Sequence, residues 1–88
     1  MPKFVQLIGL RRGIRRTDRA IEEVLVRLGR QYDEEFASFK RRTDAGMTPE
    51  DAANASVGLS VHLEEALADL KRARWGFQLD LLHLGCAA

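Results

Sequence analysis

Residues 48–84 decide the fold of this chain, and they read TPEDAANASVGLSVHLEEALADLKRARWGFQLDLLHL. Thr48 can cap the first turn of a helix, because its hydroxyl accepts hydrogen bonds from free backbone N–H groups. Pro49 suits the first helical position, where its missing N–H costs nothing. Glu50 and Asp51 place negative charge at the positive end of the helix dipole. This opening is the strongest helix start in the chain.

Apolar and small residues then recur in steps of three or four, which is the spacing of one helix face. They are Ala52, Ser56, Leu59, Leu63, Leu67, Leu70, Arg74, Phe77, Leu81 and Leu84. We therefore predict one helix over 48–84. From Trp75 to Leu81 the apolar residues also alternate as they would in a strand. The phase of the stripe favours a helix over 75–84, but the periodicity alone leaves the strand open.

A partner helix is predicted over 17–43. Its stripe consists of Ile21, Leu25, Leu28, Tyr32, Phe36 and Phe39. The turn that follows contains Gly46 and has the length of an antiparallel helical hairpin. Counting outward from this turn places Phe36 opposite Ala55 or Ser56, so that large side chains face small ones, as interdigitated packing requires.

Residues 1–16 form a separate apolar and basic N-terminal segment in this interpretation. Residues 4–10 fit a helix or a strand equally well, and Gly13 is expected to break the chain before the next helix. The helix over 48–84 extends beyond its partner at the far end of the hairpin. We expect residues 1–16 to fold onto that overhang.

The predicted fold class is all-α, a long antiparallel hairpin that forms one helical domain over 1–88. Two helices bury only one stripe each, which is little for a chain of 88 residues. Several apolar residues lie outside the intrachain stripes: Val24, Val57, Val61, Trp75, Leu79 and Leu82. We expect them to meet a second copy, which gives a homodimeric four-helix bundle.

Composition limits the class of protein. With 45% hydrophobic and 31% charged residues, the chain has a globular profile rather than a disordered one. No apolar run reaches the roughly 18 residues of a membrane span, and the N-terminus lacks the features of a signal peptide. A single cysteine excludes an intrachain disulfide framework and is typical of a reducing compartment. We expect a cytoplasmic protein without a membrane partner.

Basic residues concentrate near the N-terminus. Residues 1–19 carry six basic and one acidic group, net +5, whereas residues 20–88 carry eight basic and twelve acidic groups, net −4. Arginine presents a fork of donors that suits phosphate. The candidates for binding nucleic acid or an acidic partner are Arg11, Arg12, Arg15, Arg16 and Arg19. The alternative is a solvated segment paired with Glu22 and Glu23, and no nucleic-acid-binding motif decides between them.

Adjacent acidic residues stand at 22–23, 34–35 and 64–65. They resemble the paired carboxylates with which helical nucleotide pyrophosphohydrolases hold Mg²⁺. The Glu-Glu-x-x-Glu pattern of that family is not met, because Val26 and Ser38 stand where its third acid belongs. His62 and His83 would lie roughly 30 Å apart along one helix, so they cannot share a metal ion within one chain.

The chain also lacks a phosphate-binding glycine loop, a nucleophile elbow and zinc-ligand spacing. We therefore expect no catalytic residue, no metal site and no cofactor. The function predicted is that of a small non-enzymatic interaction module, an adaptor or regulator that works as a homodimer with a protein partner. The alternative prediction is a nucleic-acid-binding dimer that uses the basic residues of 11–19.

Overall fold

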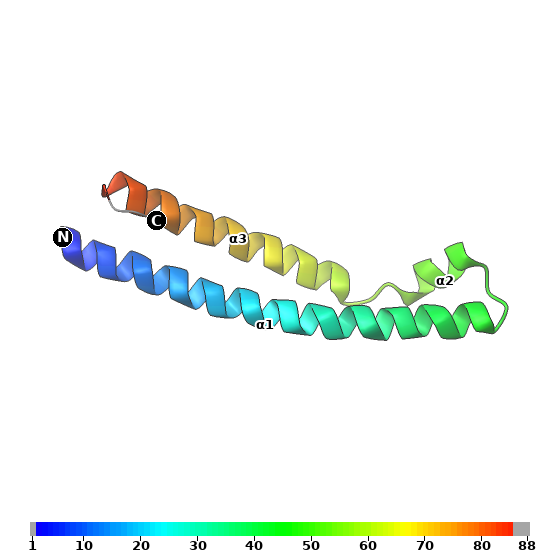
Figure 1. Cartoon of the computed structure of the whole chain (residues 1–88). Helices are drawn as coiled ribbons and strands as arrows, with labels where there is room; N and C mark the ends of the chain where they lie inside the picture. Colours follow the sequence, from blue (N-terminus) through cyan, green and yellow to red (C-terminus); the bar gives the residue numbers. More distant parts are fainter. Residues whose placement is uncertain (1, 86–88) are drawn as a thin grey trace.

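A computed structural model describes residues 2–85, which form three helices and no strand (Figure 1). Helix α1 spans Lys3–Asp44, α2 spans Pro49–Ser56, and α3 spans Ser60–His83. The chain turns after α1, and α2 and α3 return along it in the antiparallel direction. We call the end with the turn the turn end, and the other the open end. The predicted all-α hairpin is confirmed.

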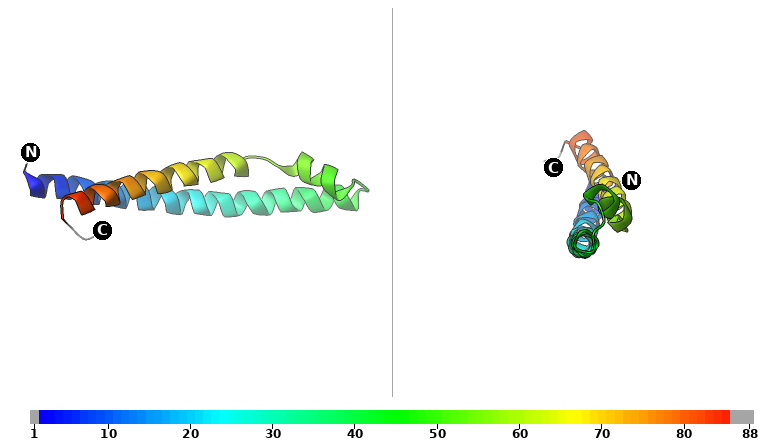
Figure 2. Two further views of the ribbon diagram at one scale, coloured as in Figure 1. Left: turned by 90° about the horizontal axis from the view of Figure 1, so that it is seen from above. Right: turned by 90° about the vertical axis from the view of Figure 1, so that its right-hand side faces the viewer.

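The molecule is a thin rod. It measures 65 × 17 × 17 Å, and its radius of gyration is 19.5 Å, against about 12 Å for a compact domain of this length. The length follows from α1, since 42 residues at 1.5 Å per residue extend for about 63 Å. In two perpendicular views α3 remains beside α1 (Figure 2). Helices α2 and α3 therefore each pack against α1 and not against each other, and much of the circumference of every helix is left uncovered.

The seam between α1 and α3 follows a seven-residue repeat. Buried or half-buried residues recur in alternating steps of three and four in both helices, which is the pattern of a coiled coil. In α1 they are Leu7, Leu10, Ile14, Thr17, Ile21, Val24, Leu28, Gln31, Glu35 and Ser38. In α3 they are Ser60, Leu63, Leu67, Leu70, Arg74, Phe77, Leu81 and Leu84. The stripe predicted for 48–84 is thus confirmed within α3, except that Ser60 replaces Leu59.

Helix α1 is continuous through Gly13, so the prediction of a separate segment over 1–16 and a helix start at 17 is wrong. Gly13 is a contact point rather than a break. A Cβ atom there would lie 2.8 Å from Cζ of Phe77, so the missing side chain allows the phenyl ring to approach the backbone. Thr17, which is buried, donates its hydroxyl to the carbonyl of Gly13 at 2.6 Å. Residues 3–14 do cover the end of α3, but as a direct extension of α1.

The single helix predicted over 48–84 is also wrong, because residues 57–59 separate α2 from α3. Glu35 explains the break. Its Oε1 accepts from the backbone N–H of Gly58 at 2.6 Å and from the hydroxyl of Ser60 at 2.7 Å. Val57 adopts an extended conformation, with φ −65° and ψ 129°. The carboxylate of α1 thus replaces part of the helical hydrogen bonding at the point where the returning chain changes direction.

Other predictions for 48–84 hold. The Thr48 hydroxyl accepts from the backbone N–H of Asp51 at 3.3 Å, and Pro49 occupies the first helical position. Residues 75–83 are helical, which excludes the strand alternative.

The predicted turn is also confirmed, since Gly46 takes φ +99° there, as a residue without Cβ can. Cys86 lies outside the described residues.

The first stripe is predicted correctly at Ile21 and Leu28 but wrongly at three other positions. Leu25, Tyr32 and Phe36 are 49%, 45% and 67% exposed. In each case the preceding residue, Val24, Gln31 or Glu35, occupies the seam. Phe36 therefore does not pack on the small residues of α2. Val24, which we expected to contact a second copy, is instead half-buried in the seam of its own chain.

Two glycines of α1 offer a matched test of this packing. Gly9→Ala should raise the free energy of unfolding by about 0.5–1 kcal/mol, because alanine favours helix and a Cβ there meets nothing within 4 Å. Gly13→Ala should be less stable than Gly9→Ala by about 1–3 kcal/mol, since the ring of Phe77 must move. Urea unfolding at one protein concentration, followed by circular dichroism, measures both. Equal effects would contradict the close contact of Phe77 with Gly13.

Candidate interaction surfaces

The seam leaves two long flanks on the hairpin. On one flank Tyr32 of α1 donates its hydroxyl to Oε1 of Glu64 in α3. On the other flank Arg27 of α1 and Leu59, just before α3, lie around a shared pocket. Side chains seven residues apart lie on the same side of a helix in a coiled coil. The two pairs therefore indicate on which flank the other residues of α1 and α3 lie. We call the two surfaces the Tyr32 flank and the Arg27 flank.

The Tyr32 flank gathers the exposed apolar side chains. Of the fourteen exposed large apolar residues in the described chain, eight lie here: Phe4, Ile8, Leu25, Tyr32, Phe36, Val61, Trp75 and Leu82. Their exposed fractions range from 43% to 67%. Monomeric proteins seldom leave so many large apolar side chains exposed on one flank, although charged residues such as Arg11 and Asp18 of α1 and Lys71 of α3 stand between them. The row draws on both helices, so it belongs to the hairpin rather than to either helix alone.

The residues predicted for a dimer interface are only partly brought together. Val61, Trp75 and Leu82 follow one another at seven-residue intervals on the Tyr32 flank. Leu79 stands on the outer side of α3, one turn from both Trp75 and Leu82. Val57 is exposed in the link between α2 and α3. All five are exposed, whereas Val24 is half-buried in the seam.

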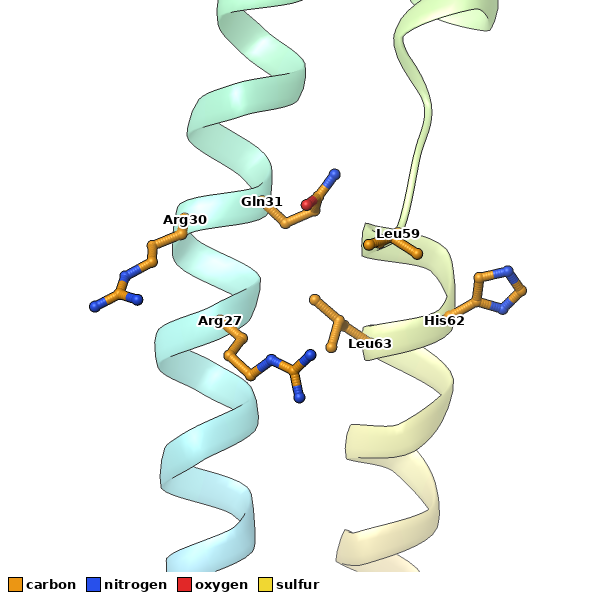
Figure 3. A pocket seen from close by; sticks show the side chains of 6 residues that line it. All are labelled: Arg27, Arg30, Gln31, Leu59, His62 and Leu63. Atoms are coloured by element: carbon orange, nitrogen blue, oxygen red, sulfur yellow. The ribbon is translucent and has the colours of Figure 1, made fainter.

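The Arg27 flank is more polar in the same region. Its pocket is lined by Arg27, Arg30, Gln31, Leu59, His62 and Leu63 (Figure 3). The side chain of Leu63 points toward α1, while those of Arg30 and His62 point outward from the two helices. Cations therefore border the pocket, and this flank offers less apolar surface than the Tyr32 flank.

A groove on the Arg27 flank lies at the open end. It is lined by Val5, Gln6, Gly9, Leu10, Phe77, Asp80, His83 and Leu84. Gly9 keeps it open, since no side chain fills the space beside its backbone. Asp80 and His83 add ionisable groups to otherwise apolar walls.

Four of the candidate arginines were expected in a separate N-terminal segment over 1–16, but all five lie on helix α1. Arg11, Arg12, Arg15, Arg16 and Arg19 are all exposed on α1, and the last four line a shallow hollow on its surface. Within residues 2–85 none of the five forms an ion pair. Asp18, the one acid among them, instead accepts from Arg74 at 2.6 Å. The suggested pairing with Glu22 and Glu23 is not observed.

The titration of Tyr32 is clearly shifted. Its hydrogen bond to Glu64 raises the pKa of the phenol above the ordinary 10.0, since the proton is held against a carboxylate. Partial desolvation and the negative charges of Glu64 and Glu35 act in the same direction. Because folding raises this pKa, the bond stabilises the fold below the ordinary value and is lost as the pH rises through the raised one.

This bond can be tested directly, because Tyr32 is the only tyrosine in the chain. Glu64→Gln should lower the pKa of Tyr32 toward 10.0, since the carboxylate charge disappears. An alkaline titration followed by the near-ultraviolet absorbance of tyrosinate measures the midpoint. Glu65→Gln is the matched control, because Glu65 is exposed and faces His62 instead. An identical midpoint in wild type and Glu64→Gln would contradict the contact.

The role of Glu35 was not predicted from the sequence, in which it stands out only as one of the adjacent acids at 34–35. Oε1 of Glu35 is the acceptor for Gly58 and Ser60, and Oε2 is buried without a hydrogen-bond partner among the described residues. One signal was available. Glu35 stands seven residues after Leu28, and that interval returns a side chain to the same seam.

Neither a metal-binding cluster nor a helix suited to crossing a membrane is found in residues 2–85. In that range no three side chains of His, Cys, Asp or Glu lie close enough together to hold a metal ion. None of the helices there combines the length and the apolar character that crossing a membrane requires. No family model, curated protein or solved structure matches this chain.

Proposed function

We propose that this protein is a small non-enzymatic interaction module, an adaptor or regulator that acts as a homodimer through its Tyr32 flank. The observation that carries the proposal is the row of eight exposed apolar side chains on this flank. A two-fold dimer uses the same patch on both subunits, so one apolar flank per chain is sufficient. Two hairpins joined in this way form a four-helix bundle.

The exposed area supports the proposal. A folded monomer of 9.9 kDa exposes about 5,200 Å². This chain exposes 6565 Å², and the excess is about 1,400 Å². A standard protein–protein interface removes about 800 Å² from each partner. Pairing of two hairpins would therefore remove more than half of this excess.

The small core points in the same direction. In the described residues only Leu28, Ala52 and Leu81 are buried apolar side chains. Fully burying one large apolar side chain contributes about 1.5–3 kcal/mol. Covering Tyr32, Phe36, Trp75 and their neighbours would therefore add stabilisation to a fold that has few fully buried apolar side chains.

Sedimentation equilibrium or light scattering across a concentration series tests the homodimer. We expect the wild-type protein to be dimeric. The double variant Trp75→Asp/Leu82→Asp should weaken the dimer at least about 100-fold, because both copies lose apolar contacts and gain buried charge. The matched control is Val26→Asp, which places the same charge on the outer side of α1, away from the flank. A wild-type protein that remains monomeric at all concentrations would refute the proposal.

The arginines favour a second candidate function, binding of a nucleic acid. Arg12, Arg15, Arg16 and Arg19 share one hollow, and no carboxylate within residues 2–85 neutralises them through an ion pair. Guanidinium groups on one helix face can contact successive phosphates.

Binding to a labelled single-stranded DNA across a salt series separates this function from simple solvation. Replacing the four arginines of the hollow by alanine should weaken binding and reduce the slope of log K against log salt by about 0.7 per lost phosphate contact. A control with the exposed residues Arg27, Arg30, Lys40 and Arg41 replaced by alanine removes the same charge elsewhere. Equal losses in the two variants would contradict a specific role for the hollow.

A further inference from the structure

The charge of the hairpin is divided along its length. Asp18 bonds to Arg74 and Tyr32 bonds to Glu64, so the middle of α1, at Val24, lies level with Leu70 of α3. The open half, residues 2–23 and 70–85, carries nine basic and four acidic residues, net +5. The turn half, residues 24–69, carries five basic and nine acidic residues, net −4. One end of the rod is therefore positive and the other negative.

The apolar residues of the Tyr32 flank are also arranged on both sides of this middle level. Tyr32 and Phe36 of α1 lie toward the turn end, whereas Trp75 and Leu82 of α3 lie toward the open end. Phe36 is twelve residues from Val24, and Leu82 is twelve residues from Leu70, roughly 18 Å in each case. The two groups thus stand at similar distances from the middle in opposite directions.

Gly29 adds a third feature to the turn half. It stands on the Tyr32 flank between Leu25, Tyr32 and Phe36, at helical spacings of four, three and seven residues. Glycine weakens a helix, and nothing within the chain lies within 4 Å of a Cβ atom built there. The chain's own packing does not require this bare position. A bulky side chain from outside could rest against the backbone at Gly29.

We propose that two copies pair antiparallel along their Tyr32 flanks, about a two-fold axis near the level of Val24 and Leu70. This inference rests on the proposed homodimer and adds its orientation. In such a pair the positive half of each rod lies beside the negative half of the other, and opposite charges favour that orientation. Phe36 of one copy reaches the level of Leu82 in its partner. Trp75 comes within about one helical turn of the level of Tyr32, close to the bare surface at Gly29.

A parallel pair would have the opposite electrostatics. It would place two +5 halves side by side and two −4 halves side by side. Like charges that face each other across an interface oppose association and select against that orientation. An antiparallel and a parallel pair could bury the same apolar area, so the division of charge decides between the two orientations.

Pulsed dipolar spectroscopy between spin labels tests the orientation. One variant, Met47→Cys/Cys86→Ser, carries a single label in the turn, and a second, Val26→Cys/Cys86→Ser, carries it on the outer side of α1 near the middle. In an antiparallel dimer the two labels at position 47 should be separated by nearly the full 65 Å of the rod. The labels at position 26 should be separated by only a few rod widths of 17 Å.

Each result separates the inference from the function on which it rests. A short distance at both positions shows a parallel dimer, which overturns the orientation and leaves the homodimer intact. The absence of any dipolar coupling at position 26, together with a monomeric mass by light scattering, overturns both. A long distance at position 47 with a short one at position 26 supports the antiparallel pair.

Discussion

The seam between α1 and α3 is the constraint on which the rest of this structure depends. Its seven-residue repeat keeps two long helices in contact over most of their length. The seam is apolar toward the open end, where Leu81 is buried and Phe77 lies against Gly13. Toward the turn it is polar, with Gln31, Glu35 and Ser38 in the repeat positions of α1. Polar groups in such a seam favour one register over others, because a shifted register would leave them without partners.

This seam also determines what remains uncovered. A pair of helices can bury one stripe from each, and the residues on either side of that stripe stay in water. In this chain the two sides differ in character, since the row of exposed apolar residues lies on the Tyr32 flank, whereas cations border the pocket of the Arg27 flank. The proposals about association follow from that difference and from the uneven distribution of charge along the rod.

Much of the architecture could be predicted from local signals. The Thr48 cap, the turn at Gly46 and the stripe of α3 are properties of neighbouring residues, and the structure confirms them. The errors concern information held elsewhere in the chain. Gly13 resembles a helix break until Phe77 is placed against it. Leu25, Tyr32 and Phe36 were assigned to the core because they are apolar, yet Glu35 occupies the seam, where Gly58 and Ser60 provide its donors. The exposure of the arginines on α1 could be predicted from the sequence. Their arrangement on a helix could not, because it depends on the continuity of α1 through Gly13.

The interruption at residues 57–59 divides the returning chain into two mechanically distinct parts. In a continuous helix one inserted residue rotates everything beyond it by about 100°. Here the turn and α2 are joined to α3 by non-helical backbone, and Glu35 fixes the start of α3 from the opposite helix. Changes of length in the tip, residues 45–57, could therefore be absorbed locally without altering which side chains of α3 face α1. The tip is thus a cap that packs on α1 through Ala52, on a rod whose alignment is set independently, and its turn is where this scaffold could vary or accept a grafted loop.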